Sequence, residues 1–487
     1  MARTNETTPL LLNEPVQDTE AHQKPKTITP LPKFQLGIVS CMKLVEPLAY
    51  AQIFPYINEY IRYLGVTDNP KRIGFYSGSV ESAFALFQLV AIYHMAKLSD
   101  RIGRRPVLFT GVAGVGIATM LFGLSTSFPM LIAIRALAGL CSGNSAVALS
   151  VVGELTDETN VGLAMSIFGV SWPIGSIIGP LVGGGLSNPA ARHHWLDWPL
   201  LRRFPYFLPG AVSGTLTLTA VFIGYLFLKE TLPKKLRSRR STGATIHSSM
   251  DITAPDEDQK PLTMRELLSI PIIFNLAGSG FALSFLTTGF EVLFALYSYT
   301  AVENGGLGFP PAKIGYALSV SGILLVLLQV LFMPWLLRTF DKAKMFNVTM
   351  SLFLFLYPLL AILNPIARSG YDEATGKLDP STNALLWAVI VVILIFARFA
   401  NLGFGLSMVL TKEHCPNPAS LGVSNGAITF VMSMARATGP AFASSMFAFC
   451  VDRNLLGGFA WVIPMIFITL GGMYQASRVT KMRAESK

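Results

Sequence analysis

The chain has 487 residues, of which 52% are apolar and 14% are charged, whereas soluble domains carry about 25% charged residues. Its mean hydropathy of +0.51 excludes an ordinary water-soluble protein, because such an apolar chain is typical of a membrane protein. The net charge of +10 does not indicate nucleic-acid binding, since the basic residues form short clusters between apolar runs, as cytoplasmic loops do.

The first 33 residues are polar, rich in Pro and Thr, and mixed in charge, which predicts a disordered cytosolic tail at 1–33. Within it, Glu6, Leu10 and Leu11 resemble an acidic dileucine signal that a sorting adaptor would bind. This resemblance implies a vacuolar or lysosomal membrane, with the plasma membrane as the alternative.

Twelve apolar stretches follow, each long enough for a membrane-spanning helix of about 20 residues. They lie at 36–57, 74–95, 107–124, 128–152, 162–186, 206–228, 272–299, 314–336, 345–366, 384–410, 420–450 and 457–475. We therefore expect an all-α membrane protein with twelve transmembrane helices in two six-helix bundles, at 34–228 and 267–476. Residues 229–266 have too few apolar side chains for a core and predict a cytosolic linker, and 477–487 a cytosolic tail.

The basic residues predict the orientation. With both termini in the cytosol, the inner segments hold 24 Lys and Arg residues and the outer loops hold 10. Cytoplasmic loops are the ones enriched in Lys and Arg, so this excess favours two cytosolic termini.

The loop between spans two and three carries the most specific pattern, A-K-L-S-D-R-I-G-R-R over residues 96–105. It resembles the signature loop of the major facilitator superfamily, G-x-x-x-D-R-x-G-R-R/K. The resemblance implies a transporter whose loop gates its conformational change, with the gating residues Asp100, Arg101, Gly103, Arg104 and Arg105. Asp100 can hold one conformation shut beside a helix N-terminus or an arginine, and the arginines can anchor the loop at the anionic leaflet.

Two glycine patterns agree with this resemblance. Span four contains Arg135, Gly139 and Gly143, which resemble R-x-x-x-G-x-x-x-G. In related antiporters the arginine takes part in proton transfer, while helix packing is the alternative. Span five resembles the antiporter pattern G-x-x-x-G-P-x-x-G-G and a longer pattern of zinc-induced-facilitator-like transporters; its residues are Ser166, Gly175, Gly179, Pro180, Gly183 and Gly184. Small residues let span five press against a neighbour, and Pro180 permits a bend. The step Gly179-Pro180 recurs as Gly439-Pro440 in span eleven, which suggests an internal duplication of the two halves.

Ionisable side chains inside the spans are costly and therefore functional candidates. We expect Glu46, Glu81 and Arg135 to couple transport to protons. The expected lining of a central cavity is Lys43, Gln88, Glu291, Arg398, Asn401 and Arg436, whose arginines suit an anionic or chelate-like substrate. The alternatives are that Lys43 and Glu46 form a structural pair and that Arg436 locks the two halves together. Glu81 has no evident partner nearby in the sequence.

These features predict a monomeric secondary transporter, with a small-molecule substrate, protons and the bilayer as partners, and no cofactor, metal or nucleic acid. Proton-coupled antiport of a drug, organic acid or metal chelate is the favoured function. A symporter or uniporter of the same fold and a non-transporting sensor are the alternatives. An enzyme is not expected, because no paired catalytic constellation is evident.

Overall fold

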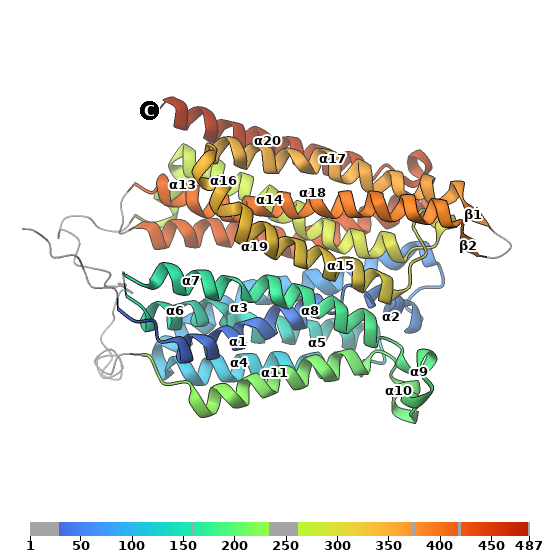
Figure 1. Cartoon of the computed structure of the whole chain (residues 1–487), viewed down its shortest axis with the longest axis horizontal. Helices are drawn as coiled ribbons and strands as arrows, with labels where there is room; N and C mark the ends of the chain where they lie inside the picture. The colour runs from blue at the N-terminus through green and yellow to red at the C-terminus, as the bar shows by residue number, and fades with distance from the viewer. Residues whose placement is uncertain (1–28, 158, 233–261, 373–375, 417–419, 486–487) are drawn as a thin grey trace, which may run out of the picture.

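The computed structural model describes residues 29–157, 159–232, 262–372, 376–416 and 420–485. Long helices run side by side along one axis, and the first and last described residues lie at the same end of the molecule (Figure 1). We call this the terminal end and the opposite one the far end. The predicted sorting signal at Glu6, Leu10 and Leu11 lies outside the described residues.

Within the described residues, the first half contains eleven α-helices and three 3-10 turns. They are α1 (Lys33–Ala51), α2 (Ile57–Tyr63), η1 (Pro70–Arg72), α3 (Ile73–Ile102), α4 (Arg104–Phe122), α5 (Phe128–Cys141), η2 (Ser142–Asn144), α6 (Ser145–Leu155), α7 (Val161–Gly169), α8 (Ser171–Leu186), α9 (Pro189–Arg192), η3 (His194–Leu196), α10 (Pro199–Arg203) and α11 (Phe207–Phe227).

The second half has the same general build, with a small hairpin at the far end. Its elements are α13 (Met264–Ser269), α14 (Pro271–Tyr299), η4 (Val302–Asn304), α15 (Pro311–Leu327), η5 (Leu328–Phe332), α16 (Met333–Thr339), α17 (Lys342–Ser369), β1 (Tyr371–Asp372), β2 (Lys377–Leu378), α18 (Pro380–Glu413), α19 (Leu421–Asp452), η7 (Leu455–Gly458) and α20 (Val462–Glu485). The strands β1 and β2 pair antiparallel, with Tyr371 opposite Leu378.

Nine helical segments within the described residues are long and apolar enough to cross a membrane, and the all-helical membrane architecture is thereby confirmed. The other three predicted spans correspond to α1, α19 and α20, which are also helical. They are less apolar, because α1 contains Lys43 and Glu46, α19 contains Arg436, and α20 ends in a basic stretch.

Several helix ends follow from local sequence. Pro271, Pro311 and Pro380 each occupy the first turn of a helix, where the missing backbone N–H costs nothing. Asp341 accepts hydrogen bonds from the backbone N–H groups of Ala343 and Lys344 and so caps α17.

Three boundaries differ from the sequence-based expectation. The tail predicted at 477–487 is helical as far as Glu485, since Arg483 binds Asp341 and Glu413 and extends the order of α20. The end of the predicted linker is ordered from residue 262, where a capping box of Thr263 and Glu266 starts α13. Span five is interrupted between α7 and α8, whereas α8 continues through Pro180.

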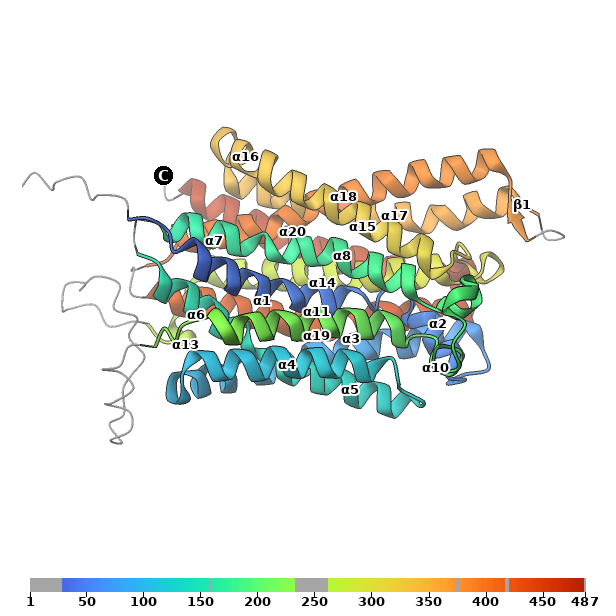
Figure 2. The ribbon, with the colours of Figure 1, turned by 60° about the horizontal axis from the view of Figure 1, so that its bottom comes forward.

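The two halves meet through two helix pairs, α3 with α19 and α8 with α15. Figures 1 and 2 both place α8 next to α15. The two pairs use matching contacts. A Cβ added to Gly78 of α3 would lie 2.4 Å from the carbonyl oxygen of Pro440, and one added to Gly315 of α15 would lie 2.4 Å from that of Pro180. The Gly-Pro steps of spans five and eleven therefore occupy equivalent places at the interface.

Candidate functional site

The most deeply buried ion pair joins α3 to α5. Arg135 donates from Nη2 to both carboxylate oxygens of Glu81, at 2.8 and 2.9 Å, and the two side chains are 3% and 1% exposed. The guanidinium also lies 4.4 Å from the ring centroid of Phe84 and 5.6 Å from that of Tyr50, in the range of a cation–π contact. The sequence had left Glu81 without a partner, and the fold supplies one from span four.

Glycine permits this approach of α5 to α3. A Cβ added to Gly139 would lie 2.3 Å from the carbonyl oxygen of Phe84, and one added to Gly143 would lie 2.7 Å from the backbone of Ala91. The R-x-x-x-G-x-x-x-G pattern is thus the surface of span four that packs on α3, with its arginine at one end of the contact.

A second buried cluster surrounds Glu46 of α1. Lys43 Nζ lies 2.5 Å from Glu46 Oε2. Gln88 of α3 donates to Glu46 at 2.9 Å and to the hydroxyl of Ser142 at 2.8 Å, and that hydroxyl donates to Glu46 at 2.7 Å. Three spans therefore share one carboxylate. Sequence reasoning missed Ser142, although its place beside Gly143 on the face of span four that packs on α3 was an available signal.

The second half contributes a looser pair. Arg398 of α18 donates from Nε to Ser321 at 2.6 Å, and its Nη1 lies 3.5 Å from Oε1 of Glu291 in α14. The Glu291 side chain is 24% exposed. One turn from Arg398, Asn401 accepts a hydrogen bond of 3.3 Å from Thr287.

Arg436 of α19 is half-buried, and its Nη2 donates to Ser433 of the same helix at 3.0 Å. α19 packs both on α14 of its own half and on α3 of the first half, so Arg436 belongs to a helix that contacts both halves.

Polar contacts link the two halves at the far end. Asp452, at the end of α19, accepts a hydrogen bond of 2.9 Å from Asn69 and forms an ion pair of 3.1 Å with Arg72 of η1. Deeper in the membrane, Ser82 accepts from the backbone N–H of Ala441 at 3.0 Å, and Ser319 donates to the backbone of Ile177 at 2.9 Å.

The expected gating loop lies at the terminal end. Arg104 binds Asp100 at 2.7 Å and Glu154 of α6 at 2.9 Å. Gly103 has a φ of 111°, which favours glycine. Two further residues were not foreseen. Glu230 accepts from the backbone N–H of Arg104 at 2.9 Å and so caps α4, and Thr231 donates to Glu154 at 2.5 Å. The loop therefore ties together the ends of α3, α4, α6 and α11.

The remaining loop arginines are peripheral to this network. The Arg105 side chain donates to the carbonyl oxygen of Tyr225 at 2.8 Å, and only its backbone N–H reaches Glu230, at 3.3 Å; Arg101 is exposed.

The glycines of span five face two neighbours. Added Cβ atoms at Gly175, Gly179 and Gly183 would meet α1 at 2.5, 2.8 and 1.8 Å, whereas one at Gly184 would meet Pro311 of α15 at 2.5 Å. Ser166 is exposed and donates to the carbonyl oxygen of Gly162 in its own helix. The glycine pattern therefore packs α8 onto α1 of its own half and onto α15 of the other half.

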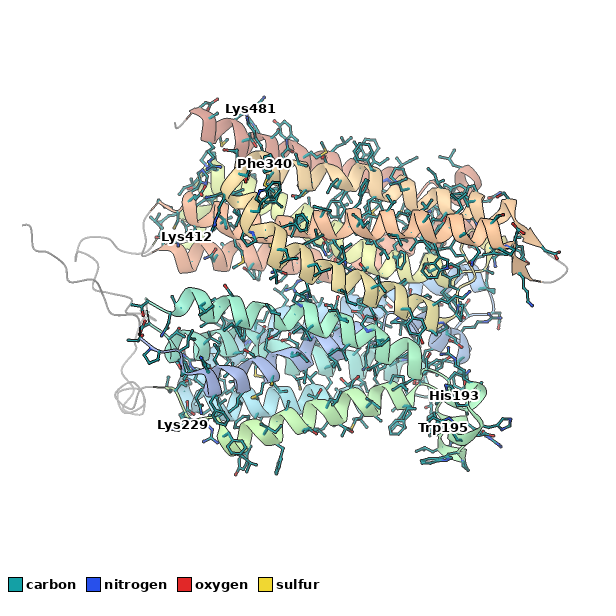
Figure 3. All side chains as sticks on the ribbon, viewed as in Figure 1. His193, Trp195, Lys229, Phe340, Lys412 and Lys481 are labelled. Atoms are coloured by element: carbon teal, nitrogen blue, oxygen red, sulfur yellow. The ribbon has the colours of Figure 1, made fainter. Side chains whose placement is uncertain are left out.

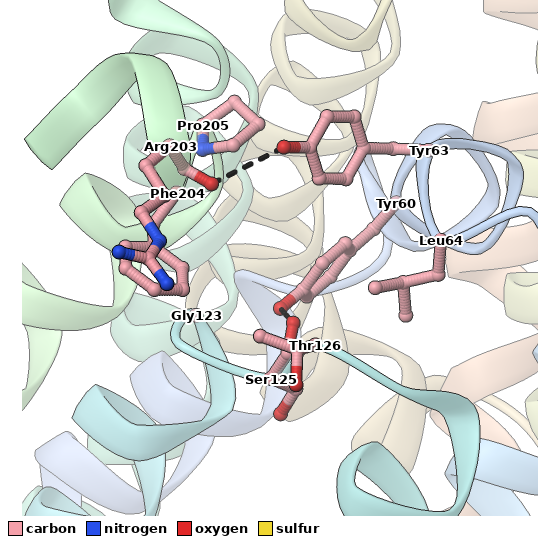
Figure 4. A pocket seen from close by; sticks show the side chains of 9 residues that line it. All are labelled: Tyr60, Tyr63, Leu64, Gly123, Ser125, Thr126, Arg203, Phe204 and Pro205. Atoms are coloured by element: carbon pink, nitrogen blue, oxygen red, sulfur yellow. Dashed lines mark hydrogen bonds between the residues drawn. The ribbon is translucent and has the colours of Figure 1, made fainter. Parts of the chain in front are cut away.

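Two pockets open at the far end, away from the buried charges. One, of about 360 Å³, lies within the first half between Tyr60, Tyr63 and Arg203. Its tyrosine hydroxyls already donate to backbone carbonyl groups (Figure 4). The other, of about 690 Å³, is lined by both halves and includes Glu59, Arg62 and Tyr299.

A family model described as Major Facilitator Superfamily matches residues 45–440. The chain is 41% identical to a major facilitator-type transporter, psiT2, of Psilocybe cyanescens, over 99% of this chain and 96% of the relative. It is 26% identical to the protein ZINC INDUCED FACILITATOR 1 of Arabidopsis thaliana, over 90% of this chain and 89% of that one.

Among solved structures, a bacterial homologue of the human lysosomal transporter Spinster has the same fold. It matches with a TM-score of 0.64 at 13% identity, over 92% of this chain and 98% of that one.

Proposed function

Because the chain belongs to the major facilitator superfamily, we propose that it is a proton-coupled antiporter that exports or sequesters a small organic solute by alternating access. Membership makes the chain an integral multi-pass membrane transporter and not an enzyme. Proton coupling, antiport and the nature of the solute are the proposed part.

The observation that carries the proposal is the Glu81–Arg135 pair. Both groups are almost fully buried in spans of the first half, and α3 also packs on α19 of the second half. A proton bound by Glu81 would neutralise the carboxylate and release Arg135 from its ion pair, so protonation would change the charge at the interface between the halves. A carboxylate that changes partners in this way can exchange a proton for a substrate.

Glu46 is the second proposed proton carrier. Its carboxylate accepts hydrogen bonds from Gln88 and Ser142 as well as the ion pair from Lys43. Hydrogen bonds from two other spans let a change of charge at Glu46 shift α1 relative to α3 and span four. Asn401 would line the same path from the second half.

The signature loop and the glycine pattern support alternating access. In one conformation of the cycle, the Asp100–Arg104–Glu154 network would hold the helix ends of the first half together. In the other conformation, these three side chains would change partners. The close packing of α8 on α1 and α15 supports the antiporter type and the zinc-induced-facilitator-like branch, to which the span-five pattern points.

Basic side chains support an orientation with both termini in the cytosol. Lys229, Lys412 and Lys481 lie at the terminal end (Figure 3). Cytoplasmic segments are enriched in Lys and Arg, so this end would face the cytosol. We propose a vacuolar or plasma membrane location, adaptor binding through Glu6, Leu10 and Leu11, and a monomeric transporter. A symporter, a uniporter and a non-transporting sensor of this fold are the competing functions.

The test is proton flux measured against solute flux in proteoliposomes, over a panel of organic acids, amines and metal chelates. Wild type should move protons against a transported solute. Glu81→Gln and Glu46→Gln should abolish proton-driven transport, while Glu303→Gln, which removes an exposed carboxylate from a far-end loop, should not. Full coupling in both buried variants would remove them as proton carriers, and solute flux without proton flux would indicate a uniporter.

A further inference from the structure

The charges inside the described spans do not balance. Four basic and three acidic side chains lie within the helices at depth, and they are Lys43, Arg135, Arg398, Arg436, Glu46, Glu81 and Glu291. Three ion pairs account for six of them: Lys43 with Glu46, Arg135 with Glu81, and Arg398 with Glu291. Among these seven side chains, Arg436 is the one that remains without a carboxylate.

Arg436 binds only a neutral group of its own helix, the hydroxyl of Ser433 at 3.0 Å. Its guanidinium has five N–H donors, so one serine hydroxyl leaves most of them available. A cation inside the membrane is costly unless it is paired or hydrated. Because Arg436 is half-buried rather than buried, water or a ligand can reach it.

Arg436 belongs to α19, which packs on α3 of the first half. About one turn beyond it, α19 contacts α3 through Pro440, whose carbonyl oxygen faces Gly78, and through the backbone N–H of Ala441, which donates to Ser82. The uncompensated charge therefore lies where the two halves meet.

Aromatic rings lie on the opposite side of this meeting point. The ring of Tyr50 is 5.4 Å from that of Phe84, 5.3 Å from that of Phe54 and 6.0 Å from that of Trp172. Tyr50 is half-buried and Trp172 is 38% exposed, so both side chains keep accessible surface. Planar rings pack on aromatic side chains in offset or edge-on arrangements.

We propose that Arg436 binds the anionic group of the transported solute, and that the solute is an aromatic organic anion whose ring packs beside Tyr50 and Trp172. This inference rests on the proposed function, since it takes the meeting point of the halves as the transport site. A carboxylate, sulfonate or phosphate would supply the missing negative charge, and a bidentate contact with the guanidinium would orient it.

The test is equilibrium binding by titration calorimetry, with the full chain in lipid nanodiscs and no proton gradient. The probes are 2-naphthoate and 2-naphthalenesulfonate, with 2-naphthamide and 2-naphthylmethylamine as the neutral and cationic counterparts. Wild type should bind both anions at least about tenfold more tightly than the amide or the amine. Arg436→Gln should weaken naphthoate binding about 10- to 100-fold, as expected for a charged hydrogen bond, and leave amide binding unchanged.

Two further variants keep the result interpretable. Lys481→Gln removes a charge at the terminal end and should change no affinity. Arg436→Lys keeps the charge but loses the planar fork, so its affinity for naphthoate should fall between wild type and Arg436→Gln. If Arg436→Gln unfolds at a lower temperature than wild type, its weaker binding could reflect lost stability. The affinity of Arg436→Lys and the preference of the wild type for anions then decide whether Arg436 binds the anionic group.

The proposal is overturned if wild type binds the anion and the amide equally or binds neither anion. It is also overturned if Arg436→Gln keeps its affinity for naphthoate, which would assign Arg436 to locking the halves together. Binding is measured without a proton gradient, so it does not depend on proton coupling. A chain that binds naphthoate here but moves no protons in the proteoliposome assay would refute antiport and leave the anion site standing. A chain that exchanges protons for amines would refute the anion site alone.

Discussion

The Glu81–Arg135 pair makes a prediction about stability that is separate from transport. Both side chains are buried, so removal of one partner leaves an uncompensated charge, which costs about 3–5 kcal/mol. We expect Glu81→Leu and Arg135→Met each to lower the unfolding temperature of the purified protein strongly. The double variant should recover most of the loss, because apolar residues of similar volume often replace a buried pair without cost.

The control for this cycle is an exposed pair, Arg202 with Asp197, in the far-end segment. Neutralising either of those residues should change the unfolding temperature little, since exposed pairs contribute about 0–1 kcal/mol. If the two buried substitutions simply add in the double variant, the pair is not the source of the loss.

Asp157, in the loop between α6 and α7, makes a prediction about pH. Hydrogen bonds from Thr159, and then from Thr29, hold the pKa of this carboxyl below its ordinary value. A lowered pKa in the folded state means that the attachment of Thr29 is fully present above the unfolded pKa of about 3.9. It is lost only as the pH falls through the folded pKa.

A spin label at Pro30→Cys, in a variant without native cysteines, measures this attachment. The label should be equally immobile from pH 8 to pH 5, and Asp157→Asn should release it at pH 7. Asp197→Asn, at the far end, should leave it immobile. Loosening of the wild-type label between pH 7 and pH 5 would contradict the assignment to Asp157.

At this scale the sequence identified most of the charged candidates but not how they pair. Lys43 and Glu46 are three residues apart on one helix, so their contact follows from helical spacing. The partner of Glu81 lies 54 residues away on another span, and no local pattern specifies it. Ser142 and Glu230 were missed because a hydroxyl in an apolar span and a carboxylate at a helix end are ordinary features of a sequence.

The packing of α8 on α1 is testable with neighbouring glycines. A Cβ at Gly183 would lie 1.8 Å from the carbonyl oxygen of Gln52, whereas one at Gly185 would meet nothing within 4 Å. Gly183→Ala should therefore destabilise the protein by about 1–3 kcal/mol through overpacking. Gly185→Ala should be neutral or slightly stabilising, because alanine favours a helix by about 1 kcal/mol over glycine.

Thermal unfolding in the same detergent compares the two variants directly. Equal effects would show that the contact between α8 and α1 tolerates a methyl group and that the glycines of span five do not set the distance between the helices.

At the scale of elements, apolar length predicted where the helices lie, because a membrane span needs about 20 apolar residues. It could not predict the interruption of span five at Val170 or the π-helical turn of η5 in span eight. The apolar periodicity of a span carries no signal for such local breaks in the helix. The helical continuation of α20 to Glu485 depends on partners in other elements.

For the whole molecule, the two Gly-Pro steps were the sequence feature that came nearest to the architecture. They suggested an internal repeat, and the structure places Pro180 opposite Gly315 and Pro440 opposite Gly78 at equal separations. The sequence did not predict the glycines that face these prolines, Gly78 and Gly315, since each is a single small residue in an apolar span. The symmetry of the interface thus depends on the Gly-Pro steps and on the glycines that face them. The sequence pattern had identified only the Gly-Pro steps.

The closure of the far end makes the last prediction. Asp452 joins α19 to Asn69 and Arg72 of the first half, and Arg72 is more than half exposed, so the pair is worth about 0.2–1 kcal/mol. Asp452→Ala should therefore raise the ratio of far-end-open to far-end-closed molecules only about 1.4- to 5-fold. Electron–electron distance measurements between labels at Asp68 and Leu455 should show a larger population at the longer distance.

Arg453→Ala provides the matched control, because this exposed neighbour of Asp452 changes the local charge without removing the contact to η1. Its distance distribution should match that of the wild type. A small shift for Asp452→Ala and none for Arg453→Ala would mean that polar contacts bias a closure made mainly by the packing of α3 on α19. A complete opening would mean instead that the packing at Gly78 and Pro440 contributes little, and an unchanged distribution would remove Asp452 from the closure.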